Sequence, residues 1–408
     1  MARNVINYEL FTSKKEELRA IEKKKRKNRR MKWAAGAIVL LFALLILYMI
    51  QQSRCEYYIY KEEVKTEENG GVTYDTFSDG YLKYSSYGIE YQKPYGMARW
   101  NVALSFSKPF LAMSDQYVLL GDKGGNKAIL FDESGMVQEY TMKYPIIQLD
   151  VSDNGNVVAI LQKDDVNYIY IYSKDGTQIA DTRITVDDTG YPVTAAISPD
   201  GSKLAVSFYV VEELSGKSRM AFYDFSQQVS QETNPLTGGL DYEGTLIPKL
   251  EFLSNDRLLA YGADTSYYYD LSDTPRELKK IHFDSQIESV FSGAHYFGYV
   301  CDNVDSSEGR FRIYLYNHRC QKKMETTLDM SYNDIKLIGD DIVATRDNEL
   351  TIINKHGKIL FQGELDGGNI ENVLPCFGWR TYRIVFSDKI VKMQLSFFNA
   401  DAIIGTEK

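Results

Sequence analysis

The chain has 408 residues, of which 44% are hydrophobic and 25% charged, and it contains only four cysteines. This composition excludes a disordered polymer and a disulfide-dense scaffold, and the length suits two or three ordinary domains or one repeat domain with additions. The net charge of −9 is unevenly distributed: twelve Lys or Arg and four Asp or Glu give residues 1–32 a charge of +8 and leave −17 for the rest. Two regions of opposite charge indicate two environments.

The basic segment, residues 1–32, ends in KKKRKNRRMK, in which eight of ten residues are Lys or Arg. Such a run also suits nucleic-acid binding or nuclear targeting. Because an apolar segment follows directly, we expect a cytoplasmic tail whose positive charge sets the topology and faces lipid headgroups.

The apolar segment, Trp33 to Ile50, has eighteen residues without a charge or a proline. As a helix it is roughly 27 Å long, close to the thickness of a bilayer's hydrocarbon core, so we predict a single transmembrane helix in contact with lipid. A buried helix of a soluble core and a cleaved signal peptide are the alternatives, but no small-residue cleavage site follows. The positive-inside rule then places the N-terminus in the cytoplasm and everything after Ile50 outside the membrane.

After the apolar segment we predict a juxtamembrane segment at 51–71, a β-propeller at 72–398 and a C-terminal tail at 399–408. The prediction of a propeller depends on one recurring pattern. This pattern consists of an apolar strand, a polar turn and a second apolar strand, as in AAISPDGSKLAVSF. Two further strands follow, rich in Tyr, Ile and Val. The turns recur about every 43 residues, a period typical of four-stranded propeller blades. They are centred at Asp79, Asp115, Asp153, Asp200, Asn255, Gly293, Asp340 and Gly378.

The last repeat supplies only three strands before the tail, which would leave an open edge on the ring. Propellers avoid such an edge by borrowing a strand from the other terminus. The unassigned strand-like segment is EYYIYKEEVK, residues 56–65. We therefore predict an all-β, eight-bladed propeller in which Tyr57 to Val64 pairs with Lys389 to Phe397, tying the rim close to the bilayer. A seven-bladed ring with a separate C-terminal hairpin is the alternative.

The turn ISPDGSKLAVSF resembles the WD40-like repeat of bacterial extracytoplasmic propellers such as the translocation protein of the Tol system. The match is close at Ser198 to Val206, partial at 152–160 and only a pattern elsewhere. The whole layout is similar to a bacterial family of single-pass, membrane-anchored propeller proteins described only as a domain of unknown function. This resemblance implies a fold and an extracytoplasmic location, and no activity.

The sequence contains no recognisable catalytic, cofactor or metal motif, so we predict no catalytic, cofactor-binding or metal-binding residues. A quinone-cofactor propeller would need more tryptophans than Trp100 and Trp379. Asp302, Asp305 and Glu308 would suit calcium, but they lack EF-hand spacing and favour a solvated acidic turn. Cysteine pairing stays open among Cys55, Cys301, Cys320 and Cys376, although Cys301 and Cys320 lie out of register for a direct bond. The histidines, expected at surfaces or strand ends, are His282, His295, His318 and His356.

These features predict a non-catalytic, protein-binding scaffold in the bacterial cell envelope. Its charge favours envelope proteins or cationic ligands at a propeller face over nucleic acid. Two alternatives remain open: a hydrolase or lyase that acts on envelope glycans with carboxylates near the channel, and a ligand sensor. Neither the binding face nor the oligomeric state follows from the sequence.

Overall fold

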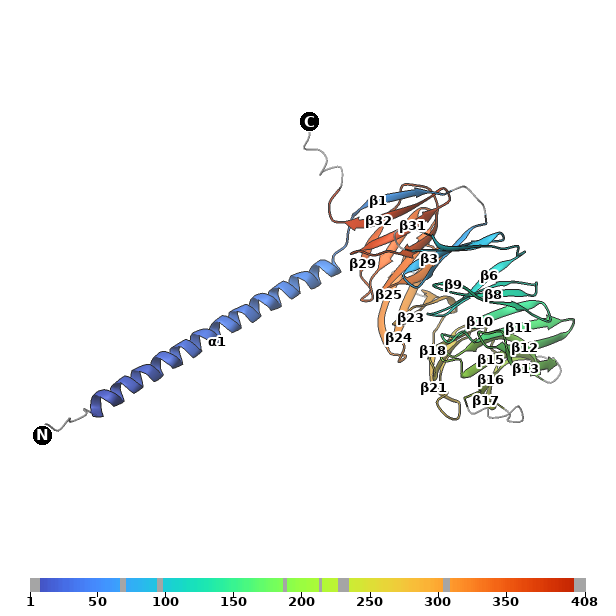
Figure 1. Cartoon of the computed structure of the whole chain (residues 1–408), viewed down its shortest axis with the longest axis horizontal. Helices are drawn as coiled ribbons and strands as arrows, with labels where there is room; N and C mark the ends of the chain where they lie inside the picture. Colours follow the sequence, from blue (N-terminus) through green and yellow to red (C-terminus); the bar gives the residue numbers. More distant parts are fainter. Residues whose placement is uncertain are drawn as a thin grey trace, which may run out of the picture. The chain divides into compact units, whose positions relative to one another are not determined.

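A computed structural model of the chain describes residues 8–66, 71–93, 98–185, 189–212, 215–226, 235–303 and 309–399. The chain divides into two compact units, residues 1–54 and 55–408. The first contains one helix and the second contains all the strands that the structure describes (Figure 1).

The helix α1 (Tyr8–Gln52) is continuous over 45 residues. It joins the basic and apolar segments that the sequence analysis treated separately, because proline is absent across the junction and Lys, Arg, Leu and Ala favour helix. Its part Lys23–Gln52 is long and apolar enough to cross a membrane, with a mean hydropathy of 2.6 over its most apolar window and none of that window buried.

The strands form eight antiparallel sheets of four (Figure 1). We number these blades in chain order. Blade 1 contains β2 (Thr73–Phe77), β3 (Gly80–Ser85), β4 (Gly88–Gln92) and β5 (Ala98–Ala103). Blade 2 contains β6 (Pro109–Met113), β7 (Val118–Asp122), β8 (Lys127–Asp132) and β9 (Gly135–Thr141). Blade 3 contains β10 (Ile146–Val151), β11 (Val157–Lys163), β12 (Val166–Tyr172) and β13 (Gln178–Thr185). Blade 4 contains β14 (Tyr191–Ile197), β15 (Lys203–Glu212), β16 (Ser215–Asp224) and β17 (Leu236–Glu243).

The second half of the ring repeats this plan. Blade 5 contains β18 (Lys249–Ser254), β19 (Arg257–Tyr261), β20 (Thr265–Asp270) and β21 (Arg276–His282). Blade 6 contains β22 (Ile287–Ser292), β23 (Tyr296–Asp302), β24 (Phe311–Asn317) and β25 (Lys322–Leu328). Blade 7 contains β26 (Asp334–Ile338), β27 (Asp341–Arg346), β28 (Glu349–Ile353) and β29 (Ile359–Glu364). Blade 8 contains β30 (Ile370–Pro375), β31 (Thr381–Phe386), β32 (Lys389–Ser396) and β1 (Tyr57–Lys65).

The eight predicted turns all lie between the first and second strands of their blades, and we call them AB turns. Serine, aspartate and glycine suit them, because short polar side chains hydrogen-bond to the nearby backbone and glycine tolerates positive φ. Gly201 in the AB turn of blade 4 has a φ of 71°. The repeat seen in the sequence is therefore the blade itself.

The apolar core is divided among eight clusters, and each cluster joins two consecutive blades. For example, Phe77 and Tyr91 of blade 1 pack with Val118 and Phe131 of blade 2. The last cluster joins Tyr74 and Tyr81 of blade 1 to the side chains of blade 8, including Val385. The ring is thus closed by apolar packing, and the propeller has eight blades, not the alternative seven.

Strand β1 completes blade 8 as the sequence predicts. Its register runs from Tyr57 opposite Ser396 to Lys65 opposite Lys389, with an irregularity between Tyr60 and Glu62. The tyrosines of β1 also reach the loop before β30. The Tyr60 hydroxyl donates to the backbone oxygen of Asp366 at 2.7 Å, and the Tyr58 hydroxyl donates to its Oδ2 at 3.1 Å. The strand that closes the ring therefore belongs to the propeller unit, which begins at Cys55.

Candidate functional site

The first strands of the blades lie around the axis of the ring, where they contact one another. Such contacts join β6 with β10, β10 with β14, β14 with β18, β22 with β26, and β30 with β2. Side chains alternate along a strand, so every second residue of a first strand faces the axis or the neighbouring first strands. Polar side chains at these positions determine the chemistry of the axis.

A cavity of about 550 Å³ opens at the AB-turn end of this axis. Blades 2 to 6 line it with residues of their first strands, and blades 2, 3, 4 and 6 add residues of their AB turns. Four carboxylates line the cavity, Asp115, Asp150, Asp153 and Glu251, and no lysine or arginine is among the lining residues that the structure describes. This axial cavity is therefore acidic, and five different blades build it.

Asp150 is the carboxylate that the fold holds most firmly. Its Oδ1 accepts the backbone N–H of Val151 at 3.0 Å, and its Oδ2 accepts the backbone N–H of Ile197, from blade 4, at 2.8 Å. Burial raises the pKa of Asp150 to about 7, against the lowering effect of these two hydrogen bonds, and the charge of Glu251 raises it further. The side chain is thus poised to change charge near neutral pH.

Neighbouring polar side chains of the first strands are also paired. Gln148 donates from Nε2 to Thr194 Oγ1 at 3.1 Å and accepts the backbone N–H of Ala195 at 3.1 Å. Glu251 accepts the Tyr261 hydroxyl at 2.8 Å and lies 3.7 Å from the Lys249 ammonium. Asp150 and Glu251 are therefore fixed by contacts made before any ligand arrives.

The AB turns themselves link consecutive blades around the cavity. The Asp115 backbone N–H donates to Asp153 Oδ1 at 2.9 Å, the Asp153 N–H donates to the Pro199 oxygen at 2.8 Å, and the Asp200 N–H donates to Asn255 Oδ1 at 3.1 Å. Hydrogen bonds thus connect the AB turns of blades 2, 3, 4 and 5 in succession.

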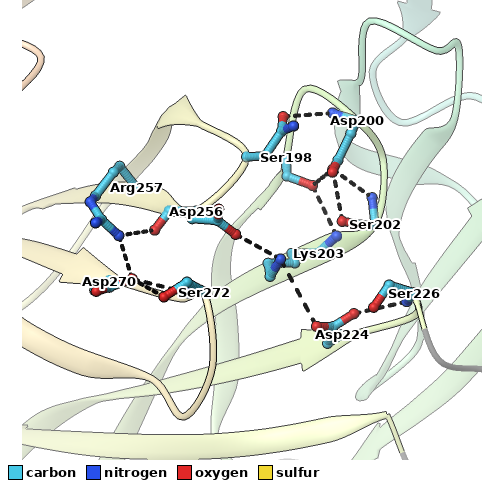
Figure 2. Close-up of polar contacts among 11 residues, drawn as sticks. Ser198, Asp200, Ser202, Lys203, Asp224, Ser226, Asp256, Arg257, Asp270 and Ser272 are labelled. Carbon is cyan, nitrogen blue, oxygen red and sulfur yellow. Dashed lines mark hydrogen bonds and ion pairs between the residues drawn. The ribbon is translucent and has the colours of Figure 1, made fainter.

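Figure 2 shows the contacts around the AB turn of blade 4. Asp200 Oδ1 accepts the Ser198 hydroxyl at 2.6 Å and the Ser202 hydroxyl at 2.8 Å, so this carboxylate stabilises its own turn. Lys203 reaches Asp256 of blade 5 at 2.9 Å and Asp224 of its own blade at 3.9 Å. The Ser-Pro-Asp-Gly motif of this turn therefore has a structural role. It stabilises the turn beside the cavity, and the carboxylate of Asp200 does not line the cavity.

The other side of the axis is joined by polar contacts. Lys336 of β26 donates to Asn372 of β30, and Asn372 Nδ2 donates to the Tyr74 oxygen of β2 at 2.7 Å. Burial raises the pKa of Asp75 on β2, and Lys336 lowers it. Lys336 thus offsets negative charge where blades 7, 8 and 1 meet.

The four histidines do not come together. His282 is exposed on β21 and contacts Thr265, His295 pairs with Asp340 at 3.0 Å, and His356 is exposed in a turn. His318 lines the axial cavity, where its Nε2 lies 3.0 Å from the Gly293 oxygen. Three of the four lie in turns, and none of the described His, Cys, Asp or Glu residues forms a metal-binding group of three.

The other residues singled out from the sequence are dispersed. Trp100 is stacked on Phe131 at a centroid distance of 5.0 Å, between blades 1 and 2. Asp302 lies at the end of β23, whereas Asp305 and Glu308 fall outside the described residues. Cys55, Cys301 and Cys320 are buried free thiols and Cys376 is a half-buried one. Burial raises the pKa of Cys301 to about 12 and that of Cys320 to about 11.

Sequence analysis did not identify Asp150, Gln148 and Glu251 as site residues. The signal that would have found them is alternation. IIQLDV and KLEFLS are first strands, and each carries polar residues at every second position, which an apolar core would not require. A further cavity of about 660 Å³ lies over blade 1 alone and is lined by residues such as Lys83 and Glu90. The axial cavity is the better candidate, because several blades converge on it.

Comparisons with known proteins identify one family and several distantly similar solved structures. A model described as "Family of unknown function (DUF5711)" matches residues 51–395. No curated protein matches the sequence. The chain is similar to the crystal structure of BamB from Moraxella catarrhalis, at 12% identity and a TM-score of 0.49, over 83% of this chain and 100% of that chain. It is also similar to Kluyveromyces lactis Hsv2, at 9% identity and a TM-score of 0.46, over 72% and 98% of the two chains. These similarities are too distant to carry an argument about function.

Asp150 generates a prediction about pH and stability. Its folded pKa of about 7 lies above the ordinary value for aspartate, so the folded chain binds the extra proton, and stability falls as the pH rises from about 4 through 7. Between pH 5 and pH 8 we expect the wild type to lose roughly 2–3 kcal/mol relative to Asp150→Asn, as measured by urea unfolding in detergent solution.

The variant Glu251→Gln provides the matched control for this prediction. It removes a charge that raises the folded pKa of Asp150, so the loss of stability should end at a lower pH and be smaller than in the wild type. The same dependence on pH in Asp150→Asn as in the wild type would show that Asp150 does not titrate in this range.

Proposed function

The chain belongs to the family of unknown function DUF5711, and we propose that it is a membrane-anchored scaffold of the bacterial cell envelope that binds a positively charged group of a protein partner in its axial cavity. The observation that carries this proposal is the cavity itself, which five blades line with four carboxylates and without a described lysine or arginine. The fold supports the binding role, because propellers present rigid loops around a central opening.

The anchor is the apolar part of α1. Its side chains are exposed in the isolated chain, among them Trp33 at 71% and Phe42 at 63%, and exposed apolar side chains over this length suit lipid better than water. The basic residues before Trp33 place the N-terminus in the cytoplasm by the positive-inside rule, and the propeller outside.

The ligand chemistry follows from the electrostatics of the cavity. A lysine or arginine side chain, or another organic cation, gains attraction from Asp150, Asp153 and Glu251, which line the same cavity. A cation would also favour the ionised form of Asp150 and lower its pKa toward the ordinary range. The scaffold should therefore bind its partner more tightly above pH 7 than below it.

This function is tested with pentalysine as the probe and pentaglutamate as the control peptide, by calorimetry on the full chain in detergent at physiological salt. We expect pentalysine to bind and the double variant Asp150→Asn/Glu251→Gln to bind about tenfold more weakly, a change of about 1.4 kcal/mol. Asp181→Asn removes an exposed carboxylate of β13 and serves as the charge control. If Asp181→Asn weakened the binding of pentalysine equally, the peptide would be attracted by the net negative charge of the propeller. The axial cavity would then not be the binding site.

A second candidate function is a glycan hydrolase or lyase. It is favoured by one observation, the raised pKa of Asp150 in a cavity that Glu251 also lines, since acid–base glycan cleavage uses a pair of carboxyl groups, one of them an acid with a raised pKa. Against it, both oxygens of Asp150 already accept backbone N–H groups. Release of new reducing ends from cell-wall glycan by the full chain, lost in Asp150→Asn, would select this function over the scaffold.

The proposed orientation gives a prediction about one thiol. Cys376 is half-buried, whereas the three other cysteines are buried, so a membrane-impermeant maleimide should label one thiol per chain in intact cells or protoplasts. Cys376→Ser should abolish the labelling, as measured by the mass of the purified chain. Labelling that occurs only after the cells are broken without detergent, so that the membranes stay intact, would place the propeller on the cytoplasmic side.

A further inference from the structure

One end of blade 8 exposes a group of aromatic side chains. The AB turn of this blade, between β30 and β31, contains Phe377 and Trp379, which are 83% and 47% exposed. Phe398 follows β32 and is 69% exposed, and Tyr57 begins β1 and is 39% exposed. Tyr57 lies opposite Ser396 in the sheet, so these residues share one end of the blade. We call these four residues the aromatic rim.

The AB turn that contributes to the aromatic rim is unlike the AB turns of the other blades. The other seven AB turns are described in full, and none of them contains an exposed large hydrophobic side chain. These seven turns are rich in serine, aspartate, asparagine and glycine, which suit tight turns. Blade 8 has PCFGWR instead. Neither the turn nor the ring closure requires Phe377 to be aromatic, because its side chain is almost fully exposed.

The rim is rigidly supported from beneath. Arg380 is buried, and its guanidinium lies 4.9 Å from the centroid of the Trp379 ring and 5.7 Å from that of Phe397. The same guanidinium donates to the Cys55 sulfur at 2.9 Å. Trp379 is thus held in place by a cation that is tied to the start of the closing strand, while one side of its indole remains exposed.

The short connection between α1 and β1 indicates that the aromatic rim lies near the membrane. Four residues, 53–56, separate the end of α1 at Gln52 from Tyr57, and an extended chain of that length spans at most about 18 Å. The aromatic rim therefore begins within that reach of the end of α1, which lies two residues after the apolar segment that we propose to cross the membrane. Tryptophan and tyrosine favour the headgroup level of a bilayer, where an apolar ring and a polar N–H or O–H are both satisfied.

We propose that the aromatic rim docks on the lipid headgroup region of the membrane that anchors the chain. This inference rests on the proposed anchor and adds a second, propeller-borne contact with the same bilayer. Two contacts restrict the tilt of the propeller, so they orient the axial cavity relative to the membrane, which a single flexible tether would not do.

The test uses the full chain in phosphatidylcholine vesicles and the fluorescence of its own tryptophans. The protein has three tryptophans, Trp33, Trp100 and Trp379. Comparing Trp33→Phe with Trp33→Phe/Trp379→Phe isolates the emission of Trp379. We expect phosphatidylcholine brominated near the top of its acyl chains to reduce that emission about twofold, because interfacial tryptophans lie at this depth.

A pair of surface variants shows whether the exposed rings make the contact. Phe377→Asp/Phe398→Asp, made in the Trp33→Phe background, should remove most of the quenching of Trp379. Tyr87→Asp is the matched control: Tyr87 is as exposed as Phe377 but lies in the turn between β3 and β4, at the other end of the strands. Unchanged quenching in the aspartate pair would overturn the proposal.

Comparing the wild type with Trp33→Phe isolates the emission of Trp33 and separates failure of the rim from failure of the anchor. If Trp33 is quenched and Trp379 is not, the rim does not dock on lipid and the anchor stands. If neither is quenched, the anchor fails and this inference fails with it. Trp379 that is shielded from aqueous iodide but not quenched by the brominated lipid would assign the rim to a protein contact or to residues 400–408, and would also overturn the proposal.

Discussion

The closure of the ring is the constraint on which the rest of this structure depends. A four-stranded sheet with two apolar faces is unstable alone, and each blade here buries its faces only because a neighbour stands on both sides. The eight clusters form an unbroken circuit, from Phe77 with Val118 around to Tyr74 with Val385. The circuit holds only if blade 8 is complete, and its fourth strand comes from Tyr57–Lys65 at the other end of the chain. The strand that follows the apolar helix is therefore also the strand that completes the fold.

The features that could be predicted from the sequence are those set by local chemistry. Turn residues and period-two alternation locate the AB turns from Asp79 to Gly378, and the missing strand of the last repeat points to Tyr57–Lys65. The axial site could not be predicted in this way, because it depends on where the ring brings first strands together. Asp150 is distinctive only once Ile197 and Glu251, from two other blades, are placed beside it. The charge changes at residue 32 but helix propensity does not, so the basic tail and the apolar segment form one helix.

Stability and function use different residues of the same repeat. In the AB turn of blade 4, the carboxylate of Asp200 accepts a hydrogen bond from a serine of the same turn, and Lys203 forms an ion pair with blade 5. This motif therefore stabilises the fold. At the axis, the first strand of blade 3 carries polar residues, Gln148 and Asp150, where a core strand would be apolar. In blade 8, the AB turn carries exposed aromatic residues, Phe377 and Trp379, where the other AB turns are polar. Departures of this kind cost stability locally, so they point to a ligand or a surface that compensates for them.

The central claim is that residues 57–65 are an integral strand of the propeller. The most direct measurement is native-state hydrogen exchange of the full chain, which compares the backbone amides of β1 with those of β31 and β32. The closed ring predicts that β1 amides exchange only with global unfolding, as slowly as those of its partner β32, because opening β1 exposes an edge and breaks the circuit. Exchange of β1 by a low-energy local opening, while β31 and β32 stay protected, would contradict closure by the N-terminal strand.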